Sequence, residues 1–220
     1  MKHRPVCFVF GAGQIPSRIP KISARDLVIA ADGGYTKIQK AGLRADVLVG
    51  DFDSIGAFPK HGNADLIVRR LPREKDQTDT MAALEYGLER GFDRFHIYGG
   101  TGGRLDHTLA NIQSLSFLLK NGARGYLHDV GSVATAFKGE IWLAARRRGV
   151  ISIFALGGPA EGVWLRGLKY ELANERLSCD FPLGVSNEFT GLPVQIKVKR
   201  GILLAVYPYG TREIEKLPTD

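Results

Sequence analysis

The sequence has 220 residues, of which 44% are hydrophobic and 24% charged, as in an ordinary globular protein with one large domain or two small ones. It holds no apolar run of the roughly 20 residues that a membrane-spanning helix needs, and no signal-peptide pattern, so we expect a cytoplasmic protein without a membrane partner. The formal net charge of +7 is scattered apart from Arg146, Arg147 and Arg148, which precede Gly149 and a predicted strand, so a solvated hairpin turn explains them better than a nucleic-acid site.

The first 125 residues alternate predicted strands with predicted helices. Short apolar runs rich in Val, Ile and Phe, each closed by Gly, Asp or Pro, predict strands at residues 6–13, 27–34, 46–54, 65–72 and 94–103. Apolar residues at helical spacing predict helices at residues 36–43, 78–91 and 105–122, and the last two end at a glycine. Strands that are apolar on both faces and alternate with helices indicate a parallel sheet covered by helices, so we expect an α/β domain over residues 1–125.

From about Gly125 the pattern changes to short strands without helices between them. The predicted strands cover residues 125–130, 132–139, 140–145, 149–156, 162–168, 170–173, 193–201 and 202–210. Such spacing is typical of an antiparallel sandwich or barrel, and we expect this second domain over residues 126–215. Cys7 and Cys179 both lie in strand-like apolar stretches, which is typical of buried free thiols rather than of a disulfide or a metal site.

Acidic residues follow four of the five predicted strands of the first domain. They are Asp32 after the second strand, Asp51 and Asp53 after the third, Asp76 and Asp79 after the fourth, and Asp106 after the fifth. Because the carboxyl ends of parallel strands lie along one edge of an open sheet, these six carboxylates are expected to converge on one crevice. Carboxylates this close repel one another unless cations lie between them, and magnesium (Mg²⁺) is the usual cation beside phosphates.

Basic residues and glycines complete the expected site. Lys75 and Arg104 are suited to bind phosphate oxygens, and the glycines allow a ligand to approach the backbone closely. These glycines are Gly33, Gly34, Gly99, Gly100, Gly102 and Gly103. The residues alone therefore predict a magnesium-dependent enzyme that takes a phosphate-containing group from ATP.

Several of these residues also have a purely structural interpretation, and both interpretations stay open. Asp32 before two glycines would shape a turn, and GDFDS could form a turn that ends in a helix cap at Ser54. Asp76 and Asp79 would suit the start of the helix at residues 78–91, a role that is compatible with metal binding. His107 at the start of the next helix is typical of a hydrogen-bonded structural histidine.

Other site types find little support in the sequence. The remaining histidines share no zinc-ligand spacing; they are His3, His61, His96 and His128. GAGQIP resembles the opening of a dinucleotide-binding loop only weakly, because Pro16 occupies the third-glycine position. No P-loop motif of the form GxxxxGK[ST] occurs.

Five short motifs occur in the order found in thiamine pyrophosphokinases, and the chain resembles that family from its first strand to Tyr207. They are ADGG (31–34), GDFDS (50–54), KDQTD (75–79), GGTGGRLDHTLAN (99–111) and GVSNEF (184–189). The resemblance implies a Rossmann-like N-terminal domain, a β-sandwich thiamine-binding domain, and a homodimer with two active sites at its interface. It also implies the reaction: the thiamine hydroxyl attacks the β-phosphorus of ATP, giving thiamine diphosphate and AMP, by in-line positioning and charge neutralisation.

The resemblance also implies roles for individual residues. The leading magnesium ligands would be Asp51, Asp53 and Asp76, with Asp32 and Asp79 in or beside that shell. Phosphate and nucleotide binding would fall to Lys75, Arg104, Gly33, Gln77, Thr78, Gly102, Gly103 and His107, with Asp106 and Asn111 ordering the loop around the nucleotide. Ser186 and Asn187 would reach the thiamine of the partner subunit's site, and Asp53 or Asp76 would accept the hydroxyl proton. Residues 201–206 are aliphatic where some family members stack an aromatic ring on thiamine, which leaves Phe189 or Tyr207 for that role.

Two other functions stay open at this level. The first is a diphosphokinase that acts on another alcohol such as hydroxymethylpterin, and the GVSNEF stretch counts against it. The second is a non-catalytic sensor of nucleotide or thiamine diphosphate, and the complete set of acids counts against it.

Overall fold

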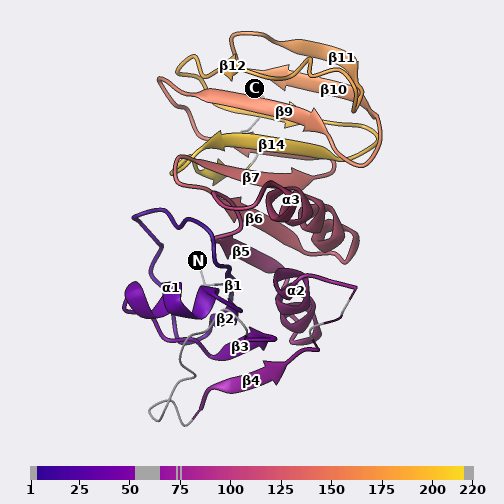
Figure 1. Ribbon diagram of the computed structural model, residues 1–220. Helices are drawn as coiled ribbons and strands as arrows, with labels where there is room; N and C mark the ends of the chain where they lie inside the picture. The colour runs from indigo at the N-terminus through magenta and orange to yellow at the C-terminus, as the bar shows by residue number, and fades with distance from the viewer. Residues whose placement is uncertain (1–3, 53–64, 73, 75, 216–220) are drawn as a thin grey trace. The chain divides into compact units, whose positions relative to one another are not determined.

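The computed structural model describes residues 4–52, 65–72, 74 and 76–215, and the chain divides into two compact units, Met1–Val130 and Gly131–Asp220 (Figure 1). The boundary falls a few residues beyond the expected one because the strand Arg124–His128 pairs in parallel with its neighbour in the first unit. We had expected this strand in the antiparallel domain, so that prediction is wrong.

The first unit is a parallel sheet with helices. Within the described residues its elements are β1 Cys7–Phe10, β2 Leu27–Ala31, α1 Gly34–Lys40, β3 Val47–Gly50, β4 Ile67–Arg70, α2 Asp79–Glu89, β5 Arg94–Tyr98, α3 Leu105–Lys120 and β6 Arg124–His128. The strands lie in the order β6-β5-β1-β2-β3-β4, and every pair is parallel. The chain builds the sheet outward from β1 to β4 and then returns to β5 on the other side of β1. The strand order therefore reverses between β1 and β5, which is the point where open α/β sheets bind ligands.

The helices cover the two faces of this sheet. Phe8 and Phe10 of β1 lie in one buried cluster with Tyr35 and Ile38 of α1. On the opposite face α2 approaches so closely that a Cβ on Gly87 would lie 2.5 Å from the ring of Phe95. Similarly, a Cβ on Gly125 of β6 would lie 2.6 Å from the side chain of Leu118 in α3. Helix α1 therefore covers one face, and α2 and α3 cover the other.

The ends of the two longer helices follow from local chemistry. Thr78 precedes α2 and its hydroxyl oxygen accepts a hydrogen bond from Met81 N at 3.1 Å, so it is the N-cap. Asp79 in the first turn interacts favourably with the helix dipole. After the helices, Gly91 and Gly122 adopt φ angles of 82° and 76°, the left-handed conformation that ends a helix at low cost. The predicted helices are confirmed.

The edge strand β4 departs from the expected pattern of strands apolar on both faces. All four of its residues are exposed, Ile67 to 46% and Val68 to 42%. The described residues place it at the end of the first unit's sheet, paired on one side with β3. The apolar residues of β4 gave no indication in the sequence that it is an edge strand.

The second unit is all-β. Within the described residues its strands are β7 Ser132–Phe137, β8 Glu140–Leu143, β9 Val150–Ala155, β10 Ala160–Arg166, β11 Leu172–Leu177, β12 Asn187–Glu188, β13 Val194–Lys197, β14 Leu203–Pro208 and β15 Glu213–Ile214. They form one group in the order β12-β9-β14-β7 and a second in the order β11-β10-β13-β8-β15. All pairs in both groups are antiparallel, as expected.

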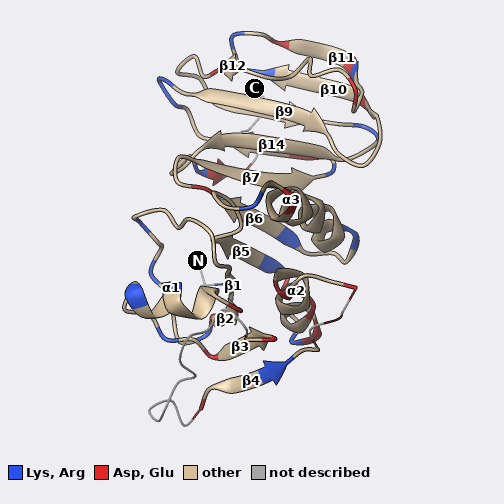
Figure 2. Cartoon of the chain, viewed as in Figure 1, with Lys and Arg blue, Asp and Glu red and all other residues tan. Residues whose placement is uncertain are grey.

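Two local predictions for this unit are wrong. Residues 146–148 connect β8 to β9, which belong to different sheets, so the arginine triplet lies in a connection between sheets and not in a hairpin. Arg147 and Arg148 are exposed, and charged residues are spread over both units (Figure 2). Both cysteines are free, but only Cys7 is buried, because Cys179 lies beyond the end of β11 and is exposed. Burial raises the pKa of the Cys7 thiol, which keeps it protonated.

No helix in the described part of the chain is long and apolar enough to cross a membrane.

Candidate active site

A cavity of about 380 Å³ opens at the carboxyl ends of β1, β2 and β5. It is lined by residues 11–13 after β1, 31–32 at the end of β2, 78–80 at the start of α2, 99–101 after β5, and 103, 104, 107, 108 and 111 around the start of α3. The cavity therefore lies at the point where the strand order reverses, as the topology of the sheet requires of a ligand site.

Two glycine-containing loops form the floor of this cavity. Gly13 N donates to Gly99 O at 2.8 Å, and Gln14 N donates to Thr101 O at 2.9 Å, so the loop after β1 is paired with the loop after β5. A Cβ on Gly13 would lie only 2.2 Å from the carbonyl oxygen of Thr101. This close approach excludes any other residue at position 13 and keeps the loop backbone open to a ligand.

The loop after β5 also presents hydrogen-bond donors. Among the described residues, the amide N–H groups of residues 100–103 donate to no protein acceptor. The loop leads directly into the N-terminus of α3, a helix of 16 residues whose dipole favours negative charge at that end. Adjacent free amides and a helix N-terminus together favour an anion such as a phosphate group.

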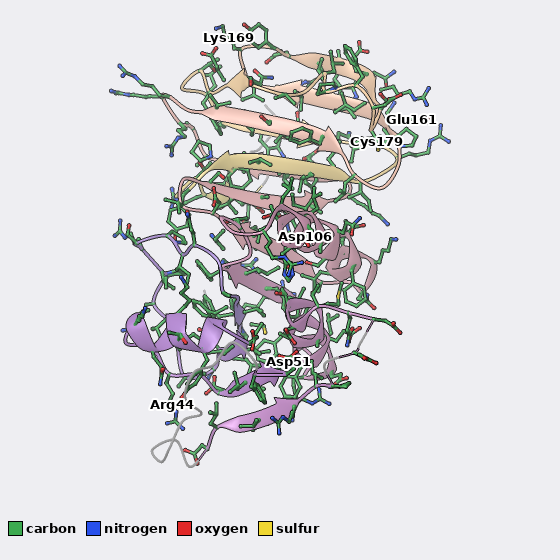
Figure 3. The ribbon with its side chains drawn as sticks, viewed as in Figure 1. Arg44, Asp51, Asp106, Glu161, Lys169 and Cys179 are labelled. Atoms are coloured by element: carbon green, nitrogen blue, oxygen red, sulfur yellow. The ribbon has the colours of Figure 1, made fainter. Side chains whose placement is uncertain are left out.

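The acidic residues do not all enter the cavity. Asp32 and Asp79 line it. Asp51, labelled in Figure 3, is half-buried directly after β3. The preceding residue, Gly50, packs against Asp32, since a Cβ on Gly50 would lie 3.2 Å from the Asp32 Cα. Asp76 is exposed in the segment before α2 and does not line the cavity.

The other expected site residues of the ADGG, GDFDS and KDQTD motifs are divided between the cavity and its surroundings. Thr78 lines the cavity, but Gly33 and Gln77 do not. Asp53 and Lys75 lie outside the described residues.

Asp32 has an unusual backbone conformation, with a φ of 46°. Its N–H donates to Val49 O at 2.8 Å and its carbonyl accepts from Tyr35 N at 3.1 Å, so neighbouring elements hold it in place. Asp and Asn tolerate this left-handed conformation better than most residues. Strained backbone that surrounding structure holds in place is common at functional sites.

The cavity offers few carboxylate ligands for a metal ion. In the described part of the chain, no three Asp, Glu, His or Cys side chains are grouped closely enough to hold one. Magnesium, however, is usually bound by only one or two carboxylates together with substrate phosphates and water. Asp32 and Asp79 both line the cavity, so they could supply that number of carboxylate ligands to magnesium bound together with a phosphate-bearing substrate.

Arg104 and Asp106 form an ion pair at the start of α3. Arg104 Nε donates to Asp106 Oδ1 at 3.1 Å and Nη2 donates to Oδ2 at 2.5 Å. This hydrogen bonding raises the pKa of Arg104 and lowers that of Asp106. Both side chains are exposed, and Figure 3 labels Asp106 in the first turn of α3. Arg104 lines the cavity and Asp106 does not, so a phosphate would compete with Asp106 for the guanidinium group.

Other residues expected in the GGTGGRLDHTLAN motif hold the loop or face the cavity. Asn111 is 4% exposed, and its Nδ2 donates to Gly100 O at 2.8 Å. His107 and Gly103 line the cavity, whereas Gly102 does not. Gly102 has a φ of 72°, and a Cβ there would lie 2.5 Å from the Gln14 side chain. Gly102 therefore allows the two loops to pack together.

The residues expected to bind thiamine lie in the second unit. Ser186 is exposed, with a φ of 59°. Asn187 is buried and clamps the backbone of Tyr170, because its Oδ1 accepts from Tyr170 N at 3.0 Å and its Nδ2 donates to Tyr170 O at 2.6 Å. Phe189 and Tyr207, the two stacking candidates, are only 5% and 3% exposed. Tyr170, by contrast, is 57% exposed.

Sequence reasoning missed part of the floor of the cavity. Gly11, Gly13 and Thr101 line it, yet none was assigned a role. The signal was present, because GAG directly follows the first buried strand and so lies at the same sheet edge as Asp32. Pro16 breaks the dinucleotide pattern that would have marked these glycines, and residues 11–26, all of them described, form no helix between β1 and β2.

Comparison with known proteins gives consistent results for both units. Residues 21–127 match the family described as "Thiamin pyrophosphokinase, catalytic domain", and residues 143–203 match "Thiamin pyrophosphokinase, vitamin B1 binding domain". The chain is 31% identical over 196 residues to the thiamine pyrophosphokinase of Bacillus subtilis, covering 87% of this chain and 92% of that protein. It is 25% identical to thiamin pyrophosphokinase 1 of Caenorhabditis elegans, covering 81% of this chain and 77% of that protein.

Solved structures give the same result. The crystal structure of the Bacillus subtilis thiamine pyrophosphokinase superposes with a TM-score of 0.82 at 29% identity, over 94% of this chain and 100% of that one. The thiamin pyrophosphokinase of Geobacillus thermodenitrificans superposes with a TM-score of 0.76 at 25% identity, over 93% of this chain and 97% of that one.

Proposed function

The chain belongs to the thiamine pyrophosphokinase family, and we propose that the cavity at the carboxyl ends of β1, β2 and β5 is where it acts on ATP. The protein is a pyrophosphotransferase: it moves the pyrophosphoryl group of ATP to the hydroxyl of thiamine, giving thiamine diphosphate and AMP. The match of residues 143–203 to a vitamin B1 binding domain favours thiamine over hydroxymethylpterin as the acceptor. The match of residues 21–127 to a catalytic domain favours an enzyme over a sensor.

ATP is placed in this cavity because hydrogen-bond donors gather where the strand order reverses, between β1 and β5. The free amides of Gly100, Thr101 and Gly103 and the start of α3 suit the phosphate oxygens, and Arg104 lines the same cavity. Phosphoryl-group transfer needs mainly in-line positioning and stabilisation of charge, and amides fixed in place provide both without reorganising. Arg104 would exchange Asp106 for a phosphate oxygen when ATP binds. Lys75 is assigned to the same phosphates.

Magnesium binding is the second part of the proposal. Asp32 and Asp79 in the cavity wall, with Asp51 directly after β3, support a site that Asp53 and Asp76 would complete. When bound, magnesium would neutralise negative charge on the phosphate oxygens. The backbone positions of these three carboxylates are fixed by secondary structure: Asp32 follows β2, Asp51 follows β3, and Asp79 lies in the first turn of α2. Asp53 or Asp76 is the proposed acceptor of the thiamine hydroxyl proton.

The thiamine side of the reaction is assigned to the second unit. Its two groups of antiparallel strands bury alternate residues, which supports a β-sandwich, and the strand order of the first unit supports a Rossmann-like sheet. Ser186 is exposed and is the proposed thiamine contact, whereas both ends of the Asn187 amide already bind the Tyr170 backbone. Asn187 would therefore act by holding the surface near Ser186. We further propose a homodimer in which Ser186 serves the partner subunit's site.

The reaction is tested by incubating purified protein with magnesium, ATP and thiamine and separating the nucleotides and the thiamine esters. Equal amounts of AMP and thiamine diphosphate are expected. ADP with thiamine monophosphate would mean that the γ-phosphorus is attacked instead. Absence of turnover with thiamine, together with turnover of hydroxymethylpterin, would reassign the acceptor.

A further inference from the structure

The loop between β5 and α3, residues 99–103, is held by its carbonyl groups. Two backbone bonds from the loop after β1 and one bond from the Asn111 side chain engage the carbonyl oxygens of residues 99–101. The amide groups of residues 100–103 donate to no acceptor among the described residues. The positions of these donors therefore depend on how firmly the loop is held.

One further contact fixes the middle of this loop through a side chain. Thr101 Oγ1 donates to Asp129 Oδ1 at 2.6 Å, and both residues are half-buried. Asp129 follows directly after β6, where His128 lies opposite Tyr98 of β5 in the parallel register. The sheet thus brings Asp129 beside the loop, although 28 residues separate it from Thr101. Thr101 lines the cavity, and Asp129 does not.

The chemistry of this contact determines what Thr101 can offer to a ligand. A threonine hydroxyl has a single proton, and a hydrogen bond to a carboxylate is shorter and stronger than one between neutral groups. Because that proton is donated to Asp129, the hydroxyl cannot also donate it to a phosphate oxygen. What remains for an anion is the Thr101 amide, together with those of the cavity-lining glycines Gly100 and Gly103.

We propose that Asp129 is a positioning residue for the pyrophosphoryl transfer, acting through Thr101 to hold the amide groups of Gly100, Thr101 and Gly103 where they bind the phosphate oxygens of ATP. The inference rests on the proposed function, because it requires ATP phosphates at this loop. Asp129 itself touches no substrate. Its loss affects the ATP side of the reaction and not the thiamine side.

The test is a double-mutant cycle in the full-length protein. Asp129→Ala and Thr101→Val should each raise the KM for ATP about tenfold, as expected for the loss of one charge-assisted hydrogen bond, with the KM for thiamine changed less than about twofold. The double variant should resemble the single variants, because residues that act through one contact show non-additive effects. Asp129→Asn keeps an oxygen that can accept the Thr101 proton but loses the charge, so its KM for ATP should lie between those of Asp129→Ala and the wild type. Thermal unfolding of each variant checks that it is folded.

Conservative replacements at Thr101 provide a second experiment, whose result does not depend on whether Asp129→Ala folds. Thr101→Ser keeps the hydroxyl and should retain the wild-type KM for ATP, whereas Thr101→Val keeps the shape and should not. Additive effects in the cycle, an unchanged ATP KM in Asp129→Ala, or equal effects on both substrates would overturn the positioning role while leaving the proposed function intact. A wild-type protein that forms no thiamine diphosphate would overturn both.

Discussion

Asp32 lines the cavity and has an unusual backbone conformation. The effect of its charge can be measured separately from the effect of its conformation. Its φ of 46° is tolerated by asparagine as well as by aspartate. Asp32→Asn should therefore fold normally while removing one negative charge from the proposed magnesium site. We expect kcat to fall by about 100-fold or more, the scale of losing one electrostatic contact to the transferred group.

The control for Asp32→Asn is the same replacement at Asp65, an exposed carboxylate that pairs with Arg44 at 2.7 Å outside the cavity. Steady-state kinetics at saturating substrates should show wild-type turnover for Asp65→Asn. Equal turnover in the two variants would remove Asp32 from the catalytic machinery.

His96 of β5, half-buried, and His128 of β6, buried, form a pair that links neighbouring strands. His96 Nδ1 lies 2.8 Å from His128 Nε2, and the two rings are stacked. Burial lowers the pKa of His96 to about 4, with Arg94 contributing, and burial together with His96 lowers that of His128 to about 3. Both rings are therefore neutral in the folded protein at neutral pH.

The stability of the protein should consequently fall in mild acid. The unfolded chain takes up protons near pH 6.5, whereas the folded pair stays neutral to about pH 4, so the stabilisation is full above pH 6.5 and is lost as the pH drops toward 4. Because two protons bind only on unfolding, the free energy of unfolding should change by at most about 2.7 kcal/mol per pH unit. Urea unfolding between pH 7.5 and 4.5 measures it. Replacing both histidines by phenylalanine, which suits their aromatic neighbours, should flatten the curve, and an unchanged slope would contradict this origin.

At the level of elements, the start of α1 depends on a residue without a side chain. A Cβ on Gly34 would lie 1.8 Å from the carbonyl oxygen of Phe10, so the helix begins in direct contact with the β1 backbone. Gly34→Ala should cost about 3 kcal/mol or more of unfolding free energy, since neither backbone can move without disturbing the sheet. Urea unfolding provides the measurement.

Gly131→Ala is the matched control for Gly34→Ala. Position 131 has nothing within 4 Å of an added Cβ, and we expect a change within about 0.5 kcal/mol. If the two variants proved equally stable, the close approach of α1 to β1 would not be required for stability.

The elements themselves were largely predictable because helical and strand periodicity is a local property. Helices α2 and α3 and the parallel strands were found where apolar spacing, caps and terminal glycines placed them. Pairing partners are not local, however, and a short apolar run such as residues 125–130 looks the same in a parallel or an antiparallel sheet. For the same reason the turn expected at residues 146–148 proved to connect two sheets.

At the level of the whole molecule, the prediction of a site at one sheet edge followed from a general property of parallel sheets. Asp32 and Asp79 line the cavity as that argument expected. The argument could not show that Asp76 is exposed, nor that Asp106 engages Arg104, because loop conformations depend on contacts that the sequence does not reveal. The bond between Thr101 and Asp129 joins the segments that follow two different strands, β5 and β6, and has no sequence signal at all.

In the proposed dimer, Ser186 of one subunit and the partner subunit's Asp32 would belong to the same active site. If Ser186 serves the partner subunit's site, a heterodimer of Asp32→Asn with Ser186→Ala carries both defects in one site and none in the other. Each homodimer should turn over poorly at low thiamine, since Asp32→Asn lowers kcat and Ser186→Ala raises the KM for thiamine. The heterodimer, isolated through two different affinity tags, should recover about half of the wild-type activity, because one of its two sites is intact. If each site were built from a single chain, every site in the heterodimer would carry one defect, and activity would equal the mean of the two homodimers.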